Sequence, residues 1–144
     1  MTDGHGKSHG GTRLGDPIPE RRRIVTQAEI NRYAEASGDR NPLHTDPEFA
    51  KQTLFQRTIA HGLLILSFLS QAMAAWDWKG WAFGGALDVA FLGPVYPGEE
   101  VVVRGKVIAF EVAEDGVYAI CEVACAVGER TVIAGTARRR LADA

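Results

Sequence analysis

The chain has 144 residues, enough for one domain with a substantial hydrophobic core. Hydrophobic residues make up 46% and charged residues 24%, and the net charge of −2 leaves no basic footprint, which argues against nucleic acid as the main partner. The most apolar run, residues 62–76, is shorter than the ~20 residues that a membrane span needs, so no membrane partner is expected.

The chain is predicted to begin with a disordered tail, residues 1–19. This segment is rich in glycine and polar residues, lacks the apolar stretch of a signal peptide, and closes with Pro17 and Pro19. A single folded domain, residues 20–144, is expected to follow it. Neither an internal repeat nor a second domain is indicated.

Helix signals dominate the first part of the predicted domain. Residues 20–25 are expected to form a strand or an extended lead-in. Residues 26–29, Thr-Gln-Ala-Glu, match a capping box, the reciprocal side-chain pattern that starts a helix, and Gly38 is placed to end that helix. Residues 39–44 are then expected to form a loop, and Pro47 suits the first position of a second short helix.

The apolar run predicts a central helix over residues 62–76. Its hydrophobic side chains occur all round the helix, and a helix of that kind must be enclosed by other elements. Four strand patterns follow, at residues 82–92, 100–111, 117–127 and 130–141. Hairpin turn signals separate them: Pro97-Gly98, Glu114-Asp115-Gly116 and Gly128-Glu129.

The strand at residues 117–127 is apolar at every second position, as expected when one face of an antiparallel sheet lies on a core. That face carries Cys121 and Cys125, which are too few for a disulfide scaffold and lack the redox Cys-x-x-Cys spacing. We expect two small buried thiols and a reducing cytoplasm.

One apolar helix followed by antiparallel strands predicts an α+β hot-dog fold, in which a curved sheet wraps around a central helix. Such a sheet has open edges that a second copy can cover, so a homodimer or a higher homo-oligomer is expected.

The polar loop and its flanks resemble a known family. The residues that carry the resemblance are Tyr33-Ala34-x-x-Ser37-Gly38-Asp39-x-Asn41-Pro42-Leu43-His44-x-Asp46-Pro47 and Phe55-x-x-x-Ile59-Ala60-His61-Gly62. The pattern is similar to that of MaoC-like dehydratases and, more narrowly, of (R)-specific enoyl-CoA hydratases. The resemblance implies a hot-dog fold with active sites near a dimer interface, and a lyase that interconverts trans-2-enoyl-CoA and 3-hydroxyacyl-CoA.

The resemblance also implies roles for individual residues. Asp39 and His44 match the family's catalytic pair. Gly62 matches the glycine whose backbone N–H serves the thioester carbonyl, and Ser70 matches a serine that contributes to the site. Asn41 is a further candidate contact to the substrate.

The chemistry of hydration suits these residues independently. The reaction needs a held water for C3, a proton for C2, and stabilisation of the negative charge that develops on the thioester oxygen. Asp39 and His44 can grip one water between them, and the first N–H groups of a helix that begins at Gly62 can receive the oxygen. No metal or redox cofactor is demanded, and no metal-ligand spacing is present.

Simpler explanations exist for most of these residues taken singly. Asp39 alone suits a turn after a helix-ending glycine, Ser70 can bond back to its own helix, and His61 is more simply a brace for the loop. His44 has no comparable local duty, so the joint pattern carries the prediction.

Other functions and contacts stay open at this stage. The substrate carrier is coenzyme A or an acyl-carrier protein, and a 3-hydroxyacyl-ACP dehydratase, a hot-dog acyl-CoA thioesterase and a non-catalytic acyl-thioester binding subunit are alternatives. Lys51, Arg57 and the run Arg138–Arg140 are candidate contacts for the carrier's phosphates. The sequence does not choose among them, and the run is more simply a solvated edge of the sheet.

Overall fold

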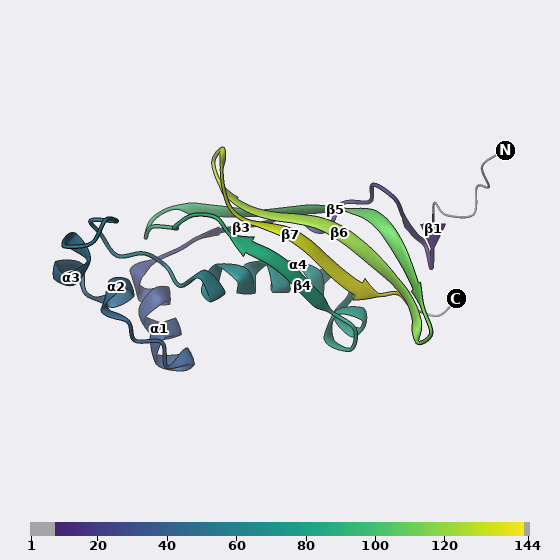
Figure 1. Cartoon of the computed structure of the whole chain (residues 1–144), viewed down its shortest axis with the longest axis horizontal. Coiled ribbons are helices and arrows are strands. Elements are labelled where there is room, and N and C mark those ends of the chain that lie inside the picture. The colour runs from purple at the N-terminus through teal and green to yellow at the C-terminus, as the bar shows by residue number, and fades with distance from the viewer. Residues whose placement is uncertain (1–7, 143–144) are drawn as a thin grey trace.

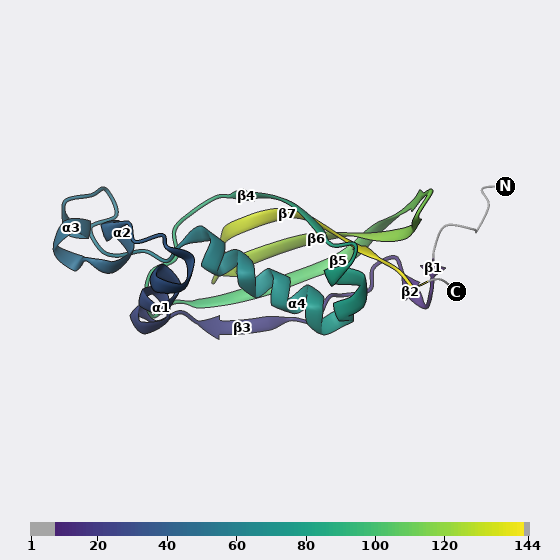
Figure 2. The same ribbon diagram turned by 90° about the horizontal axis from the view of Figure 1, so that it is seen from below.

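The computed structural model describes residues 8–142, which form a curved antiparallel sheet along one long helix (Figure 1). The strands are β3 (Arg21–Ile24), β4 (Ala86–Phe91), β5 (Glu100–Ala113), β6 (Gly116–Val127) and β7 (Arg130–Arg140), in the order β3-β5-β6-β7-β4. The helix α4 (Gly62–Ala82) runs along one face of this sheet (Figure 2). The shorter helices α1 (Gln27–Ser37), α2 (Pro42–Thr45) and α3 (Pro47–Lys51) gather at one end. The predicted α+β hot-dog fold is confirmed.

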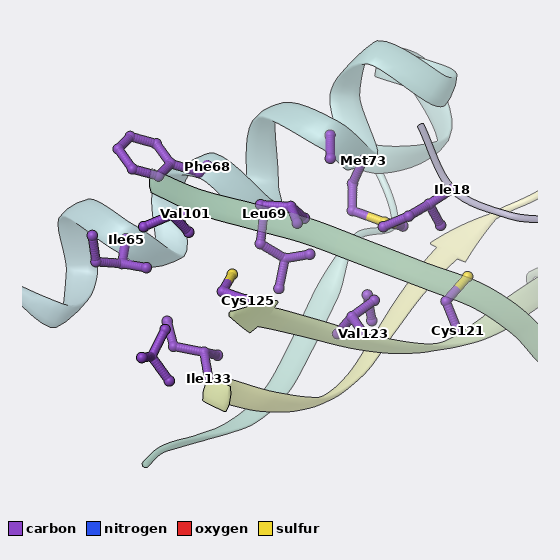
Figure 3. Packing of buried hydrophobic residues seen from close by; sticks show 14 of the residues in the cluster. Ile18, Ile65, Phe68, Leu69, Met73, Val101, Cys121, Val123, Cys125 and Ile133 are labelled. Atoms are coloured by element: carbon purple, nitrogen blue, oxygen red, sulfur yellow. The ribbon is translucent and has the colours of Figure 1, made fainter. Parts of the chain in front are cut away.

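The hydrophobic core lies between α4 and the sheet (Figure 3). The helix contributes Leu64, Ile65, Phe68, Leu69, Ala72 and Met73, and each of these side chains is buried. On β6, alternate positions from Ala119 to Cys125 are at most 1% exposed, as the period-two pattern predicted. Cys121 and Cys125 are free and buried, and burial raises the pKa of each thiol to about 11.

The central helix extends further than its apolar pattern predicted. It reaches Ala82, but Asp77 has non-helical dihedral angles (φ −158°, ψ 95°), so two helical segments meet there at a kink. The predicted end at residue 76 therefore coincides with the kink. No helix among the described residues 8–142 combines the length and the apolar character that crossing a membrane would require.

Residues 8–19 do not form the predicted disordered tail. The short strands β1 (Ser8–His9) and β2 (Thr12–Arg13) pair as a hairpin, and the amide of Ile18 donates to the Gly105 carbonyl of β5 at 2.9 Å. The Ile18 side chain is only 3% exposed. The prediction was wrong for these residues because the backbone of residues 15–18 bonds to β5 and the Ile18 side chain packs in the core. Residues 1–7 of the predicted tail lie outside the described residues.

The arginines near the end of the chain do not form a solvated edge. β7 is an interior strand because β4 pairs with its outer side, from Ala86↔Arg138 to Phe91↔Ile133. The same arrangement separates β4 from β5, so the turn at residues 97–98 is not a hairpin, whereas the turns at residues 114–116 and 128–129 are.

Arg139 is buried within this arrangement, and only 5% of it is exposed. Its guanidinium donates to the Asp77 carboxylate at 2.5 Å and to the Thr12 hydroxyl at 3.1 Å, and it lies 3.8 Å above the Trp76 ring. One side chain thus joins the sheet, the kink in α4 and the amino-terminal hairpin.

Candidate active site

The polar loop between α1 and α3 is fixed at three places by helix caps. Gly38, with a φ of 79°, ends α1, the helix that the complete capping box of Thr26 and Glu29 begins. The Asn41 side chain accepts from the Leu43 amide and starts α2, a short helix where a loop was predicted. The Asp46 carboxylate caps α3, and Pro47 occupies the first position of this helix as predicted. These caps give the loop a defined shape.

Asp39 and His44 face each other across this loop. Nε2 of His44 lies 4.0 Å from Oδ2 of Asp39. Nδ1 of His44 lies 2.8 Å from the Ile59 carbonyl oxygen, and only a protonated nitrogen can bond there, so Nδ1 carries the proton. Nε2 is therefore the nitrogen available to accept a proton, and it points toward the carboxylate.

His61 braces both members of this pair. Its Nε2–H donates to the Asp39 carbonyl oxygen at 2.9 Å, and its ring stacks on the His44 ring with centroids 3.8 Å apart. The residue is 2% exposed, and its Nδ1 has no hydrogen-bond partner among residues 8–142. Burial is the main cause that lowers the pKa of His61, so the imidazole is neutral at neutral pH. The interpretation of His61 as a bracing residue agrees with these contacts.

The buried state of His61 predicts a specific pH dependence of stability. Because the pKa of folded His61 lies below its unfolded value, the unfolded chain takes up a proton that the folded chain does not. The stability is complete above about pH 6.5, the unfolded pKa, and is lost as the pH falls from there toward the folded pKa. In His61→Gln, this loss should become smaller, because glutamine keeps an N–H for the Asp39 carbonyl but does not titrate. Thermal unfolding of both proteins between about pH 5 and 8 measures the difference, and identical slopes would contradict the prediction.

Gly62 opens α4 directly beside these residues. As the first residue of the helix it has a backbone N–H without an intrahelical acceptor. A Cβ atom at this position would lie 2.9 Å from the Phe91 ring of β4, so glycine allows the ring to approach.

Two hollows meet at Gly62. The smaller, about 330 Å³, is lined by Tyr33, Ser37, Asp39, His44, His61, Gly62, Leu63 and Phe91. The larger, about 540 Å³, is mainly apolar, with Phe55, Ile59, Ile65, Val95, Val132 and Ile133 among its lining residues. His44, Gly62 and Phe91 border both hollows. The polar pair therefore lies at the entrance to an apolar cavity.

The structure does not bring Asn41 and Ser70 into these hollows. Asn41 is used as a helix cap, and the Ser70 hydroxyl accepts from the Trp81 indole N–H at 2.9 Å. Neither residue lines a hollow that holds Asp39 and His44. Their predicted contacts to the substrate stay predictions.

Phe91 is the site residue that sequence reasoning missed. It lies on β4, almost fifty residues after His44, and it borders the site only because β4 pairs at the sheet edge beside α4. An exposed phenylalanine at a strand end carries no local signal of such a role.

Asp39, His44 and His61 each offer one potential metal-ligand atom within 4.8 Å of the others. The two imidazole rings are stacked with centroids 3.8 Å apart and 27° between their planes, an arrangement that does not favour convergence of their lone pairs on one ion. One nitrogen of each ring is also committed to a backbone carbonyl. The cluster is therefore better suited to proton transfer than to metal binding.

Comparison with known proteins gives a family match. The sequence model of the MaoC like domain matches residues 11–124. The chain is 36% identical over 101 residues to a mitochondrial 3-hydroxyacyl-[acyl-carrier-protein] dehydratase of Arabidopsis thaliana, which covers 67% of this chain and 57% of that protein. It is 40% identical over 83 residues to an (R)-specific enoyl-CoA hydratase of Aeromonas caviae, covering 57% of this chain and 61% of the relative. The chain thus matches about six tenths of the length of these relatives.

The fold has solved counterparts. The structure of the (R)-hydratase from A. caviae involved in PHA biosynthesis superposes with a TM-score of 0.79 at 29% identity, covering 93% of this chain and all of that one. The similarity therefore includes both the sheet with its central helix and the end of the molecule that holds Asp39 and His44.

Proposed function

Because this chain belongs to the MaoC-like domain family, we propose that it is a hydro-lyase that interconverts trans-2-enoyl-CoA and (R)-3-hydroxyacyl-CoA. The observation that carries the proposal is the placement of the Asp39–His44 pair beside the free backbone N–H of Gly62, at the entrance to an apolar cavity. These groups supply a base, an oxyanion donor and room for an acyl chain.

In the proposed reaction the pair holds one water through both of its hydrogens. A water oxygen about 2.8 Å from each of two acceptors, with its hydrogens about 104° apart, separates those acceptors by about 4.4 Å. Nε2 of His44 and Oδ2 of Asp39 are 4.0 Å apart, close to that separation. The lone pairs of the water are then free to attack C3 while His44 takes up one proton. The pair returns that proton to C2. The hydroxyl group of the water is then bonded to C3 and its proton to C2, so the atoms balance.

The thioester oxygen is proposed to bind at the start of α4. Negative charge develops on this oxygen as C3 is attacked, and the Gly62 N–H together with the partial positive charge of the helix N-terminus stabilises it. The acyl chain then occupies the larger hollow.

Gly62→Ala should lower kcat/KM about 10–100-fold, because misplacement by about 1 Å at a reacting centre has effects of this size. The added methyl group meets the Phe91 ring and displaces either the ring or the incoming carbonyl. The melting temperature should change little, since the Phe91 ring is 53% exposed and can move. Steady-state kinetics with crotonyl-CoA measure the effect. A normal kcat/KM in a folded Gly62→Ala protein would contradict the prediction that the substrate carbonyl needs the space beside this position.

The substrate panel tests the whole proposal. Loss of enoyl-thioester absorbance with trans-2-enoyl-CoA of several chain lengths, followed by chiral analysis of the product, should reveal hydration to the (R)-alcohol. The same assay with an acyl-carrier-protein thioester tests the dehydratase alternative, which the relative named for that activity favours. Release of free thiol from saturated acyl-CoA would indicate a thioesterase, and tight binding without turnover would indicate a binding subunit.

We also propose that the protein is a homodimer or a larger homo-oligomer. β4 ends the sheet, so its outer edge is unpaired among the described residues, and Leu63, Phe91 and Leu92 beside it are each more than half exposed. A second copy at this edge would cover these apolar side chains, each of which borders at least one of the two hollows. A molecular mass from light scattering tests the assembly.

The two free thiols suit the reducing cytoplasm that we propose as the location of the protein.

A further inference from the structure

We propose that Arg57, stacked on Tyr96, binds the phosphate of the thioester carrier at the rim of the larger hollow. The identity of this ligand, a phosphopantetheine thioester, rests on the proposed function. Arg57 lies between Phe55 and Ile59, and Tyr96 follows Val95; these three flanking residues line the hollow. The pair is therefore placed where an acyl chain leaves the cavity and its carrier begins.

Arg57 differs from the other basic candidates in having a free charge. Salt bridges or hydrogen bonds engage the alternatives: Lys51 with Glu48, Arg138 with Glu111, Arg139 with Asp77, and Arg140 with the Asp115 carbonyl. Within residues 8–142, no carboxylate forms a salt bridge with Arg57, and the residue is exposed. Its guanidinium is thus available to a ligand.

The stacking arrangement suits an oxyanion. The guanidinium carbon of Arg57 lies 3.9 Å from the Tyr96 ring centroid, and the residue is exposed, so its N–H groups are accessible beside the ring. The planar N–H edge of arginine matches phosphate oxygens in a bidentate manner.

Glu99, which follows Tyr96 closely in the chain, does not compete for the charge of Arg57. Glu99 holds the Tyr96 amide at 2.9 Å and accepts two bonds from Arg130, at 3.0 and 2.9 Å. Arg130 also lies 5.9 Å from the Tyr96 ring. Two arginines, Arg57 and Arg130, thus lie near Tyr96, and the Glu99 carboxylate is paired with Arg130. The positive charge of Arg57 therefore remains for the phosphate.

The span from the reacting carbonyl to this site is within reach of one ligand. Arg57 and Gly62 are five residues apart, so their Cα atoms are separated by at most about 18 Å. A pantetheine arm is long and flexible enough to cover such a distance. The same arm and phosphate occur in coenzyme A and in acyl-carrier proteins, so the proposed contact serves both carriers.

A matched pair of substrates isolates the phosphate. Wild-type protein should use the trans-2-butenoyl thioester of 4′-phosphopantetheine with a kcat/KM about tenfold above that of the pantetheine thioester, since a hydrogen bond to a charged group contributes this much. In Arg57→Gln the advantage should disappear, with the change in KM and not in kcat, and Arg57→Lys should retain part of it. Arg21→Gln is the control, because this arginine is exposed on β3, the edge strand opposite β4. This variant should keep the full preference, about tenfold, for the phosphopantetheine thioester.

Two results would overturn the assignment. The first is that Arg57→Gln lowers kcat/KM equally for the phosphopantetheine thioester and the pantetheine thioester. The second is that Arg57→Gln lowers kcat/KM for crotonyl-CoA but leaves it unchanged for the phosphopantetheine thioester and for crotonyl-acyl-carrier protein. Calorimetric binding of 4′-phosphopantetheine itself gives a readout that needs no turnover. If wild-type protein binds it about tenfold more tightly than Arg57→Gln does while no thioester is hydrated, the phosphate site stands and the proposed reaction fails.

Discussion

Asp39→Asn and His44→Gln should each lower kcat for the hydration of crotonyl-CoA by about 10²–10⁴-fold, the contribution typical of a positioned acid or base. Asparagine removes the charge that polarises the water, and glutamine removes the free imidazole nitrogen that accepts its proton. The melting temperature should stay nearly unchanged for Asp39→Asn, because that side chain is 55% exposed and asparagine can still accept from the Asn41 amide.

Two matched variants control for the substitutions themselves. Asp46→Asn makes the same chemical change seven residues away, at a helix cap where asparagine is an equally good residue, and should retain activity. His9→Gln repeats the histidine change in the amino-terminal hairpin. If Asp39→Asn or His44→Gln retained near-normal turnover, the assignment of the catalytic pair would be wrong.

Asp77→Ala should lower the free energy of unfolding by about 2–4 kcal/mol, because it leaves the buried Arg139 cation without its counter-ion. Burial already lowers the pKa of Arg139 and so disfavours its charge, and its Nε has no hydrogen-bond partner in the described part of the chain. For a chain of this length the melting temperature should fall by about 5–15 °C. Thermal or urea unfolding measures the loss.

An exposed ion pair supplies the comparison for this prediction. Glu35 and Arg40 lie 2.8 Å apart, but their side chains are 70% and 66% exposed. Glu35→Ala should therefore cost less than about 1 kcal/mol. Equal losses in the two variants would mean that burial of Arg139 does not govern the effect.

Local signals predicted the parts of the fold that depend on neighbouring residues. The capping box before α1, the glycine that ends it and the alternating face of β6 all appear as predicted, because each rests on contacts within a few residues. Sheet order could not be predicted in this way. β4 pairs with the outer side of β7 as far as Arg138, and this long-range pairing makes β7 an interior strand where a solvated edge was expected.

The candidate site divides along the same line. Asp39, His44 and Gly62 were predicted from one motif and lie together. Phe91 was missed because tertiary pairing alone brings it there. Ser70 lies on the predicted helix, but its hydroxyl bonds to Trp81, a contact that depends on how the chain turns back after the kink. The helix or strand that holds a residue was thus easier to predict than the side chain that the residue contacts.

Ile59 separates two duties between its main chain and its side chain. The carbonyl oxygen holds Nδ1 of His44, and every amino acid offers that same acceptor. The side chain lines the larger hollow, so its size and shape contribute to the space proposed for an acyl group. Under the proposed function, exchange of Ile59 for another apolar residue should therefore change the preferred acyl group while the His44 imidazole keeps its tautomer. Substrate preference could then change at this position without any change to the proposed catalytic pair.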